Sequence, residues 1–344
     1  MGMSVLVTST FGLSPDDVAF DTRGIACADA KTGANLEKIL RAFIGGYNTA
    51  LRSSDPTFVS KQLASEFDSH HVGFAFEGAG MCYALFDLLA PWSKSRLRSF
   101  TDGAGRKHDY IATVGAGFAV ARVPWGRWLL TGYLQRLEAT VAWCVIDGYG
   151  FHQGYFYPDR FTVAWREPPS ALPAYGRRLF AAGVGRSFWW TQGASPTLIK
   201  QTIDRFPPID RLEMWCGIGV AASYAGGVEA RVLRELLEQA GEYRGDFLSG
   251  FPFAARMRQK GENPSSWTDH ACVEFLKMTS DEAANLLAAE VDKIVAELEG
   301  REPQIREEGY GRLRKALRHH LVGQQASMDW RSARAEKMGK TYAA

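Results

Sequence analysis

Two stretches of the chain, 139 to 140 residues apart, repeat the same pattern. The first contains Pro56–Thr57 and then Gly78–Gly80, and the second contains Pro196–Thr197 and then Gly217–Gly219. Each copy therefore has a Pro-Thr helix start followed by a Gly-x-Gly within an apolar run. A repeat of this length predicts an internally duplicated domain with two pseudo-symmetric halves, and a site where the halves meet.

Most of the chain has the apolar spacing of α-helices. Leu36, Ile39 and Phe43 recur at helical spacing, and Pro56 begins a further helix where its missing N–H costs little. Further helices are expected at residues 84–89, 137–146, 198–203, 232–240 and 280–298. Strand-like alternation is sparse, although residues 4–25 are less regular and can hold a strand or an extended arm, so we predict a mainly α fold. The predicted units are residues 1–168, residues 169–330 and a polar tail at 331–344, with Pro168–Pro169 as the link.

The two Gly-x-Gly motifs predict close helix packing. Glycine costs about 1 kcal/mol relative to alanine inside a helix, so its repeated use indicates that another backbone or a ligand approaches closely. A dinucleotide-binding fingerprint needs a preceding strand, a third glycine and an acidic residue further along, and these are missing. We therefore expect tight helix contacts at Gly78–Gly80 and Gly217–Gly219, and no dinucleotide site.

Composition sets wide limits on function. The 344 residues are 46% hydrophobic, enough for a large core, and include 40 basic and 38 acidic residues. A net charge of +2 argues against a nucleic-acid-binding or membrane-binding surface. The five cysteines are widely spaced, with no disulfide or zinc pattern. No apolar stretch reaches about 18 residues, so we expect a cytoplasmic protein without a membrane span, as a monomer or a homodimer.

Charged residues within apolar runs are candidate site residues. Glu77 occupies the place that Cys216 has in the second copy, and its carboxylate is costly to bury without a partner. Arg186 stands where the first copy has Tyr47. If the halves pack symmetrically, Glu77 and Arg186 both face the boundary between them, either as a structural ion pair or as groups that orient a substrate.

A second candidate pair is Asp147 and His152, separated by glycines and aromatic residues. A carboxylate and an imidazole suit general acid–base catalysis, so both are candidate catalytic residues together with Glu77. The structural alternative is a helix-capping Asp147 and a buried His152 with satisfied hydrogen bonds. His270, next to Asp269, is the candidate counterpart in the second half.

Near the N-terminus, Asp16, Asp17 and Asp21 match the DDxxxD pattern of class I isoprenoid enzymes. In those enzymes the carboxylates lie on one helix face and coordinate Mg²⁺, which holds a diphosphate leaving group. No second metal-binding motif follows, and Ser14–Pro15 before Asp16 also forms a good helix cap and turn. We therefore expect no cofactor, except Mg²⁺ under the terpene-cyclase alternative.

Five motifs resemble the bacterial domain-of-unknown-function family numbered 1702, and the likeness extends over about residues 10 to 325. They are Phe20–Gly24, Phe76–Ala84, Gly148–His152, Gly183–Trp189 and Trp215–Gly227. Members of that family occur in natural-product gene clusters, notably those for enediynes, beside polyene-forming polyketide synthases. The resemblance implies a biosynthetic role on an apolar, unsaturated intermediate, with a polyketide synthase or another pathway enzyme as a possible partner.

The aromatic content fits such an intermediate, because ten Trp, twelve Tyr and twenty Phe can line a cavity for a long apolar ligand. The ligand-binding candidates are Arg23, Tyr83, Arg186, Trp189, Trp215 and His270. Two alternatives stay open: a Mg²⁺-dependent, terpene-cyclase-like enzyme acting on a prenyl diphosphate, and a scaffold without catalysis.

Overall fold

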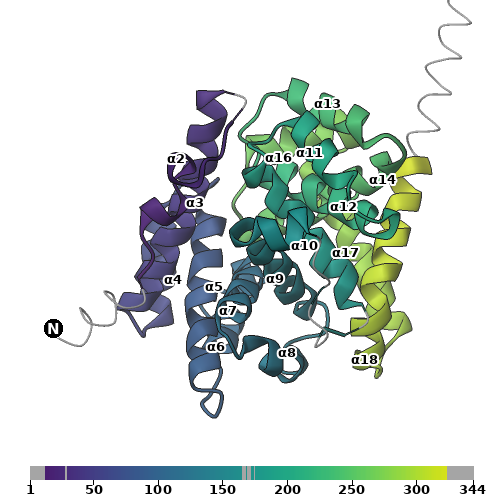
Figure 1. Cartoon of the computed structure of the whole chain (residues 1–344). Coiled ribbons are helices and arrows are strands. Elements are labelled where there is room, and N and C mark those ends of the chain that lie inside the picture. Colours follow the sequence, from purple (N-terminus) through teal and green to yellow (C-terminus); the bar gives the residue numbers. More distant parts are fainter. Residues whose placement is uncertain (1–11, 28, 165–167, 169–171, 174, 324–344) are drawn as a thin grey trace, which may run out of the picture.

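The computed structural model describes residues 12–27, 29–164, 168, 172–173 and 175–323, and every element within them is helical (Figure 1). The long helices are α3 (Ala30–Arg52), α5 (Val72–Leu89), α7 (Asp109–Arg122), α9 (Ala142–Phe156), α10 (Gly176–Thr191), α12 (Pro208–Tyr224), α15 (Phe251–Gly261) and α17 (Ser280–Glu297). Shorter helices between them are α4 (Pro56–Glu66), α6 (Arg96–Asp102), α8 (Gly126–Gln135), α11 (Pro196–Ile203), α13 (Ala230–Ala240), α14 (Arg244–Leu248), α16 (Ser266–Ala271) and α18 (Glu302–Gln304). Residues 310–323 form a further helix. The predicted mainly α fold is confirmed.

Side chains at the helix starts explain where several helices begin. Asp55 accepts a hydrogen bond from the Thr57 backbone N–H, and Pro56 occupies the first turn of α4, as predicted. Ser195 caps α11 in the same way. Thr279 and Glu282 form a reciprocal capping box at the start of α17.

Paired glycines join each long helix to the next. A Cβ on Gly78 of α5 would lie 1.9 Å from the Phe43 carbonyl oxygen of α3, and one on Gly80 would lie 2.0 Å from the Ala112 carbonyl oxygen of α7. The first glycine of α5 thus contacts the preceding long helix and the second contacts the following one. The same arrangement recurs in α7 at Gly115 and Gly117, in α9 at Gly148 and Gly150, and in α10 at Gly183 and Gly185. In α12, Gly217 contacts the preceding long helix α10, and Gly219 contacts Phe247 of the short helix α14. The predicted close helix packing is confirmed.

This packing follows a repeat much shorter than half the chain. The first glycines stand at residues 78, 115, 148, 183 and 217, so successive motifs are 33 to 37 residues apart. The 139 residues between Gly78 and Gly217 span four of these steps. The row also continues across residue 168, because Gly150 of α9 contacts Phe180 of α10. The duplication into two pseudo-symmetric halves therefore stays a prediction, and Pro169 and the tail at 331–344 lie outside the described residues.

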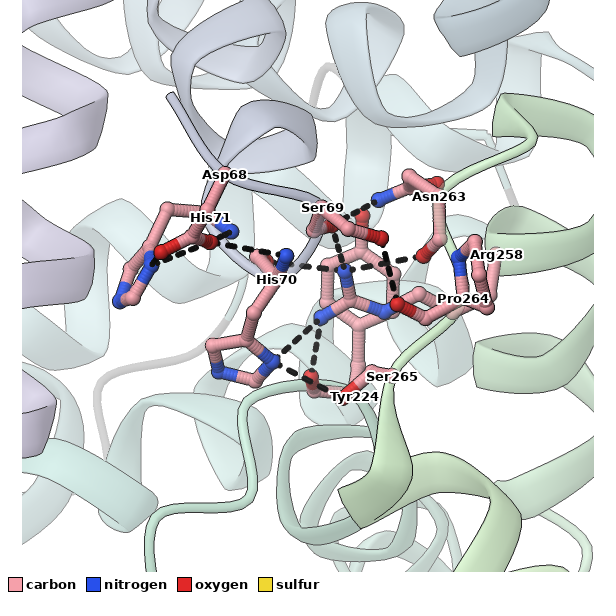
Figure 2. Close-up of polar contacts among 9 residues, drawn as sticks. All are labelled: Asp68, Ser69, His70, His71, Tyr224, Arg258, Asn263, Pro264 and Ser265. Atoms are coloured by element: carbon pink, nitrogen blue, oxygen red, sulfur yellow. Dashed lines mark hydrogen bonds and ion pairs between the residues drawn. The ribbon is translucent and has the colours of Figure 1, made fainter. Parts of the chain in front are cut away.

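Arg258, in the last turn of α15, connects the start of α5 with the end of α12 (Figure 2). Its buried guanidinium donates hydrogen bonds to the carbonyl oxygens of His70 at 2.9 Å and Tyr224 at 2.7 Å. It also lies 3.9 Å from the centre of the Tyr224 ring. Burial lowers the pKa of Arg258, and the carbonyl groups together with the ring face compensate the charge. The start of α5 and the ends of α12 and α15 are thereby held in one arrangement.

Three local expectations are corrected. The helix expected at 137–146 begins at Ala142, because residues 136–141 form turns in which Glu138 accepts a hydrogen bond from Thr140. The described part of 4–25 contains two short helices, η1 (Pro15–Val18) and α2 (Phe20–Arg23), rather than a strand. Helix α5 is apolar over 18 residues, long enough to cross a membrane by length and composition, and 89% of that window is buried in the core.

Candidate functional site

A cavity of about 330 Å³ lies among α3, α5, α7, α9, α10 and the N-terminal segment. We call it the aromatic cavity, because rings from all five of these helices line it. They are Phe43, Phe74, Phe118, Phe151, Tyr155, Phe156 and Trp190. Phe118 and Phe151 stack with ring centres 5.2 Å apart, and Trp190 meets Phe151 edge-on at the same distance. Such walls suit an elongated, apolar and unsaturated ligand.

A cluster of three charged residues lies at the inner side of this cavity. Arg186 Nη2 is 2.7 Å from Asp147 Oδ2, and Arg186 Nη1 is 3.9 Å from Glu77 Oε1. Glu77 is 4% exposed and Arg186 is 9% exposed. One cation thus faces two carboxylates in a largely dry site. The Arg186 guanidinium also lies 4.5 Å from the centre of the Phe151 ring, which fixes it against the aromatic wall.

The two carboxylates of this cluster differ from ordinary surface acids. Burial raises the pKa of Glu77 to about 7, against the effect of the Arg186 cation and with a further rise from Asp147. Burial also raises the pKa of Asp147, opposed by the closer ion pair with Arg186. Asp147 keeps 21% of its side-chain surface accessible and lines two internal cavities. Near neutral pH the cluster therefore holds a carboxyl group that readily gains or loses a proton.

Several other polar atoms in the wall of the aromatic cavity have no hydrogen-bond partner. Buried atoms without one are Arg23 Nε, Glu77 Oε1, His152 Nδ1, Tyr155 Oη, Arg186 Nε and Trp190 Nε1. A buried polar group without a partner costs about 1 to 3 kcal/mol, so their collection around one cavity indicates a ligand or ordered water there. His152 is neutral, because burial and the Arg122 cation lower its pKa to about 3.

A second cavity of about 110 Å³ lies on the other side of the charged cluster, among α7, α9, α10, α12, α15 and α17. We call it the apolar cavity. A narrow cavity of about 40 Å³ lies between the two. It shares Arg186 and Trp190 with the aromatic cavity, and Val114 and Asp147 with the apolar cavity. The three cavities thus lie in series, with the charged cluster at their junction.

One face of each central helix follows this series of cavities. The rows are Tyr110, Val114, Phe118 and Arg122 on α7; Trp143, Asp147, Phe151 and Tyr155 on α9; and Leu179, Ala182, Arg186 and Trp190 on α10. Neighbours in each row are three or four positions apart, which places them on one helix face. All three helices run from the apolar cavity to the aromatic cavity, so they run in the same direction. From Tyr110 to Arg122 the helical rise gives a path of about 18 Å.

A model of the family described as a protein of unknown function, DUF1702, matches residues 3–321. The chain belongs to the DUF1702 family. The match includes every residue that lines the three cavities, so the site lies wholly within the family region. No curated protein and no solved structure matches the chain. The family assignment made from the sequence motifs is confirmed.

The DUF1702 chain brings together part of the predicted site. Arg23, Glu77, His152 and Arg186 line the aromatic cavity, and Asp147 pairs with Arg186 next to it. Asp147 is not a helix cap, since it lies in the second turn of α9. Asp147 and His152 do not form a pair with each other: each lines a different side of the path. The predicted ion pair between Glu77 and Arg186 is present, at the long distance given above.

The other ligand-binding candidates lie elsewhere. Trp189 is fully buried and its indole N–H donates to the Gly226 carbonyl at 3.3 Å, and Trp215 packs against Phe247 in the core. Tyr83 packs on Phe100 and lines a different, shallower pocket. His270 is mostly exposed and pairs with Glu274 at 2.7 Å.

The aspartates of the DDxxxD pattern are not arranged on one helix face. Asp16 lies in η1 and Asp21 in α2, two short helices separated by extended Ala19, and both side chains are exposed. The side chain of Asp17 lies outside the described set. Within the described residues no group of three or more His, Cys, Asp or Glu side chains is placed to hold a metal ion.

The sequence reasoning did not identify the seven aromatic residues that line the aromatic cavity. Met81, Phe118, Phe151 and Arg186 each directly follow the second glycine of a Gly-x-Gly motif. All four line the aromatic cavity. The signal was therefore the 33-to-37-residue repeat, in which one position points into the cavity in four successive helices.

Proposed function

We propose that this DUF1702 protein binds a long, apolar, unsaturated biosynthetic intermediate in the aromatic cavity. The observation that carries the proposal is the set of buried, unpartnered polar atoms that gather around one aromatic-lined space. The rings receive the unsaturated body of the ligand through stacking and dispersion. Arg23 and the exposed Arg122 stand at the outer part of the cavity, where they can bind a carboxylate or another polar end group.

The series of cavities supports a linear ligand rather than a compact one. A chain that enters past Arg122 reaches Glu77 and Arg186 after passing Phe118 and Phe151. Its end can continue into the apolar cavity only by passing this charged cluster. A ligand of about 18 Å would therefore fill both cavities, with its middle section beside Glu77.

We further propose that Glu77 transfers a proton to or from the bound ligand. With a pKa of about 7, Glu77 is protonated in part of the population at neutral pH, which suits a general acid. Asp147 lies nearer to Arg186 and forms the closer ion pair, so it holds the guanidinium in place. Positive charge that develops on a protonated polyene faces Phe118, Phe151 and Trp190, whose ring faces stabilise cations.

The broader biological setting is part of this proposal. We place the protein in natural-product biosynthesis, as an enediyne-associated or related polyene-pathway protein of the cytoplasm. A polyketide synthase or a similar enzyme would supply the ligand. The proposed two-halves duplication would then consist of multiples of the glycine repeat. The charged cluster would draw Glu77 and Asp147 from the first half and Arg186 from the second, and Cys216 stands in the second half at the place of Glu77.

The test is the identity of what the purified protein carries. We expect a native mass spectrum to show about one long-chain molecule per binding site, and an organic extract to contain an unsaturated lipid or polyene. The fluorescent polyene cis-parinaric acid should bind to protein stripped of this molecule. Phe118→Ala should weaken that binding, whereas the exposed control Phe58→Ala, outside the cavity, should not. A clean apo-protein that does not bind the probe would contradict the proposal.

Glu77 also gives the protein a predicted pH dependence. Its pKa is about 7 in the folded protein and near 4.5 ordinarily, so the folded state binds more protons between these values. The contribution of Glu77 to the free energy of unfolding should therefore fall as the pH rises from about 4.5 to 7, by on the order of 2 kcal/mol. Burial lowers the pKa values of His70, His108 and His152, which act in the opposite direction, so the comparison with a variant isolates the contribution of Glu77. Glu77→Gln should flatten this fall while keeping parinaric acid binding. Denaturant titrations at pH 5 and pH 8 measure the change in the free energy of unfolding between these pH values. The same change in the variant and in the unchanged protein would show that Glu77 is not the titrating group.

A further inference from the structure

Among the described residues, half of the exposed large apolar side chains, including all three exposed tryptophans, lie at or just after the C-terminal ends of three long helices. Twelve such side chains are exposed among the described residues, and six lie at these ends of α5, α7 and α9. These six, which we call the apolar rim, are Leu89, Trp92, Trp125, Trp128, Tyr157 and Val163. Trp92 is 84% exposed and Trp128 is 69% exposed. Tryptophans with this exposure are unusual on a soluble surface and mark a contact site.

Contacts between the end of α5 and α8 fix the tryptophan-bearing part of the rim. The Trp125 indole N–H donates to the Leu88 carbonyl at 3.2 Å, and the Arg136 guanidinium donates to the Pro91 carbonyl at 3.3 Å. Helix α8 is therefore fixed against the end of α5, next to Trp92. The Tyr157 ring lies 6.0 Å from the ring of His152, which lines the aromatic cavity. The rim thus lies at the end of the helix row where that cavity is found.

Two of the rim segments are basic. Residues 90–98 and 122–136 contain six basic residues and no acidic residue, although Arg98 pairs with Asp102 at 3.3 Å. The six basic residues are Lys94, Arg96, Arg98, Arg122, Arg127 and Arg136, all exposed. The third segment, 157–163, contains one acidic and one basic residue, Asp159 and Arg160. Arg122 also lines the aromatic cavity, and the Arg127 guanidinium lies 4.9 Å from the centre of the Trp128 ring. Positive side chains therefore lie in the same segments as the three tryptophans, and one of them, Arg122, also lines the cavity.

We propose that the apolar rim docks the protein on an anionic lipid bilayer, with the mouth of the aromatic cavity at the lipid surface. Tryptophan side chains settle in the interfacial layer of a bilayer, where the ring is apolar and the indole N–H finds a partner. Arginine and lysine beside them bind anionic headgroups. Side chains that protrude, rather than line a groove, fit a soft surface better than a structured protein partner.

Docking would place the mouth of the aromatic cavity at the bilayer, in which an apolar ligand is dissolved. Transfer of the ligand between the bilayer and the cavity rests on the proposed function. The docking itself does not. Binding to a bilayer therefore has to be measured separately from binding of a ligand in solution.

Vesicle sedimentation tests the docking with the full-length protein. We expect binding to vesicles of phosphatidylglycerol and phosphatidylcholine, weaker binding to pure phosphatidylcholine, and a loss of binding as salt rises. The double variant Trp92→Ala/Trp128→Ala should lower the bound fraction by roughly tenfold or more, since each ring buries a large apolar area at the interface. The control Leu198→Ala/Ile209→Ala removes two exposed apolar side chains on α11 and α12, which contribute no residue to the rim, and should bind like the unchanged protein.

The outcomes separate this inference from the proposed function. Binding of parinaric acid in solution should be equal in the rim variant and the unchanged protein, which also shows that the variant is folded. Failure of parinaric acid to bind would contradict the proposed function without affecting vesicle binding. Absence of vesicle binding, or equal binding by the rim variant, would overturn the docking. If the protein forms a dimer in solution, does not bind vesicles, and loses the dimer in the rim variant, the docking would be overturned and the surface assigned to a second copy of the chain.

Discussion

Replacing Gly148 by alanine is expected to lower the free energy of unfolding by several kcal/mol, or to prevent folding. A Cβ at this position would lie 1.9 Å from the Val114 carbonyl oxygen, and that oxygen belongs to the backbone of α7 and cannot rotate away. Helices α7 and α9 would have to move apart along the whole contact, which opens the core beside the charged cluster. Overpacking that requires backbone shifts costs about 1 to 3 kcal/mol, and more when a rigid backbone is the obstacle.

Gly132 provides the matched control for this substitution. It lies within helix α8, and a Cβ there would meet nothing within 4 Å. Gly132→Ala should therefore raise the free energy of unfolding by about 0.5 to 1 kcal/mol, the usual gain of alanine over glycine in a helix. Denaturant titration of both variants makes the comparison. Equal effects of the two substitutions would contradict the account of the glycine row as a set of backbone contacts.

The second large effect is expected for Arg186→Met. This substitution keeps much of the side-chain volume but leaves Glu77 and Asp147 without their shared cation. Removing one partner of a buried ion pair costs about 3 to 5 kcal/mol. The carboxyl pKa values should rise further, so the folded protein can restore neutrality by taking up protons. The loss of stability should consequently be large at pH 8 and smaller at pH 5, where the carboxyl groups are protonated.

Replacing Glu77 and Asp147 by neutral residues tests whether the stability lost in Arg186→Met is due to the unpaired carboxylates. Adding Glu77→Gln and Asp147→Asn to Arg186→Met removes both carboxylates and should restore much of the stability at pH 8. The measurement is again denaturant titration at the two pH values. A triple variant as unstable as Arg186→Met alone, with no pH dependence in either, would show that packing of the arginine, rather than its charge, supports this part of the core.

The sequence was sufficient to predict the helical class, the tight packing at the glycines and the meeting of Glu77 with Arg186. These features follow from local rules, because a glycine pair or a lone charge within an apolar run has few stable environments. The duplication over 139 to 140 residues stays a prediction, and the shorter interval of 33 to 37 residues within it was not noticed. Comparison of Gly78 with Gly217 detected every fourth step, because the intermediate motifs share little more than their glycines.

Other features depend on how the helices are placed in space. Trp189 and Trp215 stand beside the same glycine motifs as the cavity residues, and only the helix rotation decides that they face the core while Trp190 lines the cavity. The net charge of +2 gave no sign of a basic end, since acidic residues elsewhere balance it. Asp16 and Asp21 matched a motif whose chemistry requires one continuous helix. In the structure they lie on two short helices, because extended Ala19 interrupts the helix between them.

The most direct test of the central claim is to locate a ligand in the protein. Crystals grown with a long-chain carboxylic acid that carries a bromine atom at its end would give an anomalous signal at the position of that atom. The account predicts a carboxylate near Arg23 or Arg122 and a chain that runs between Phe118 and Phe151, with the bromine at or beyond Glu77. Bromine found only on the outer surface, with the aromatic cavity filled by ordered water, would contradict it.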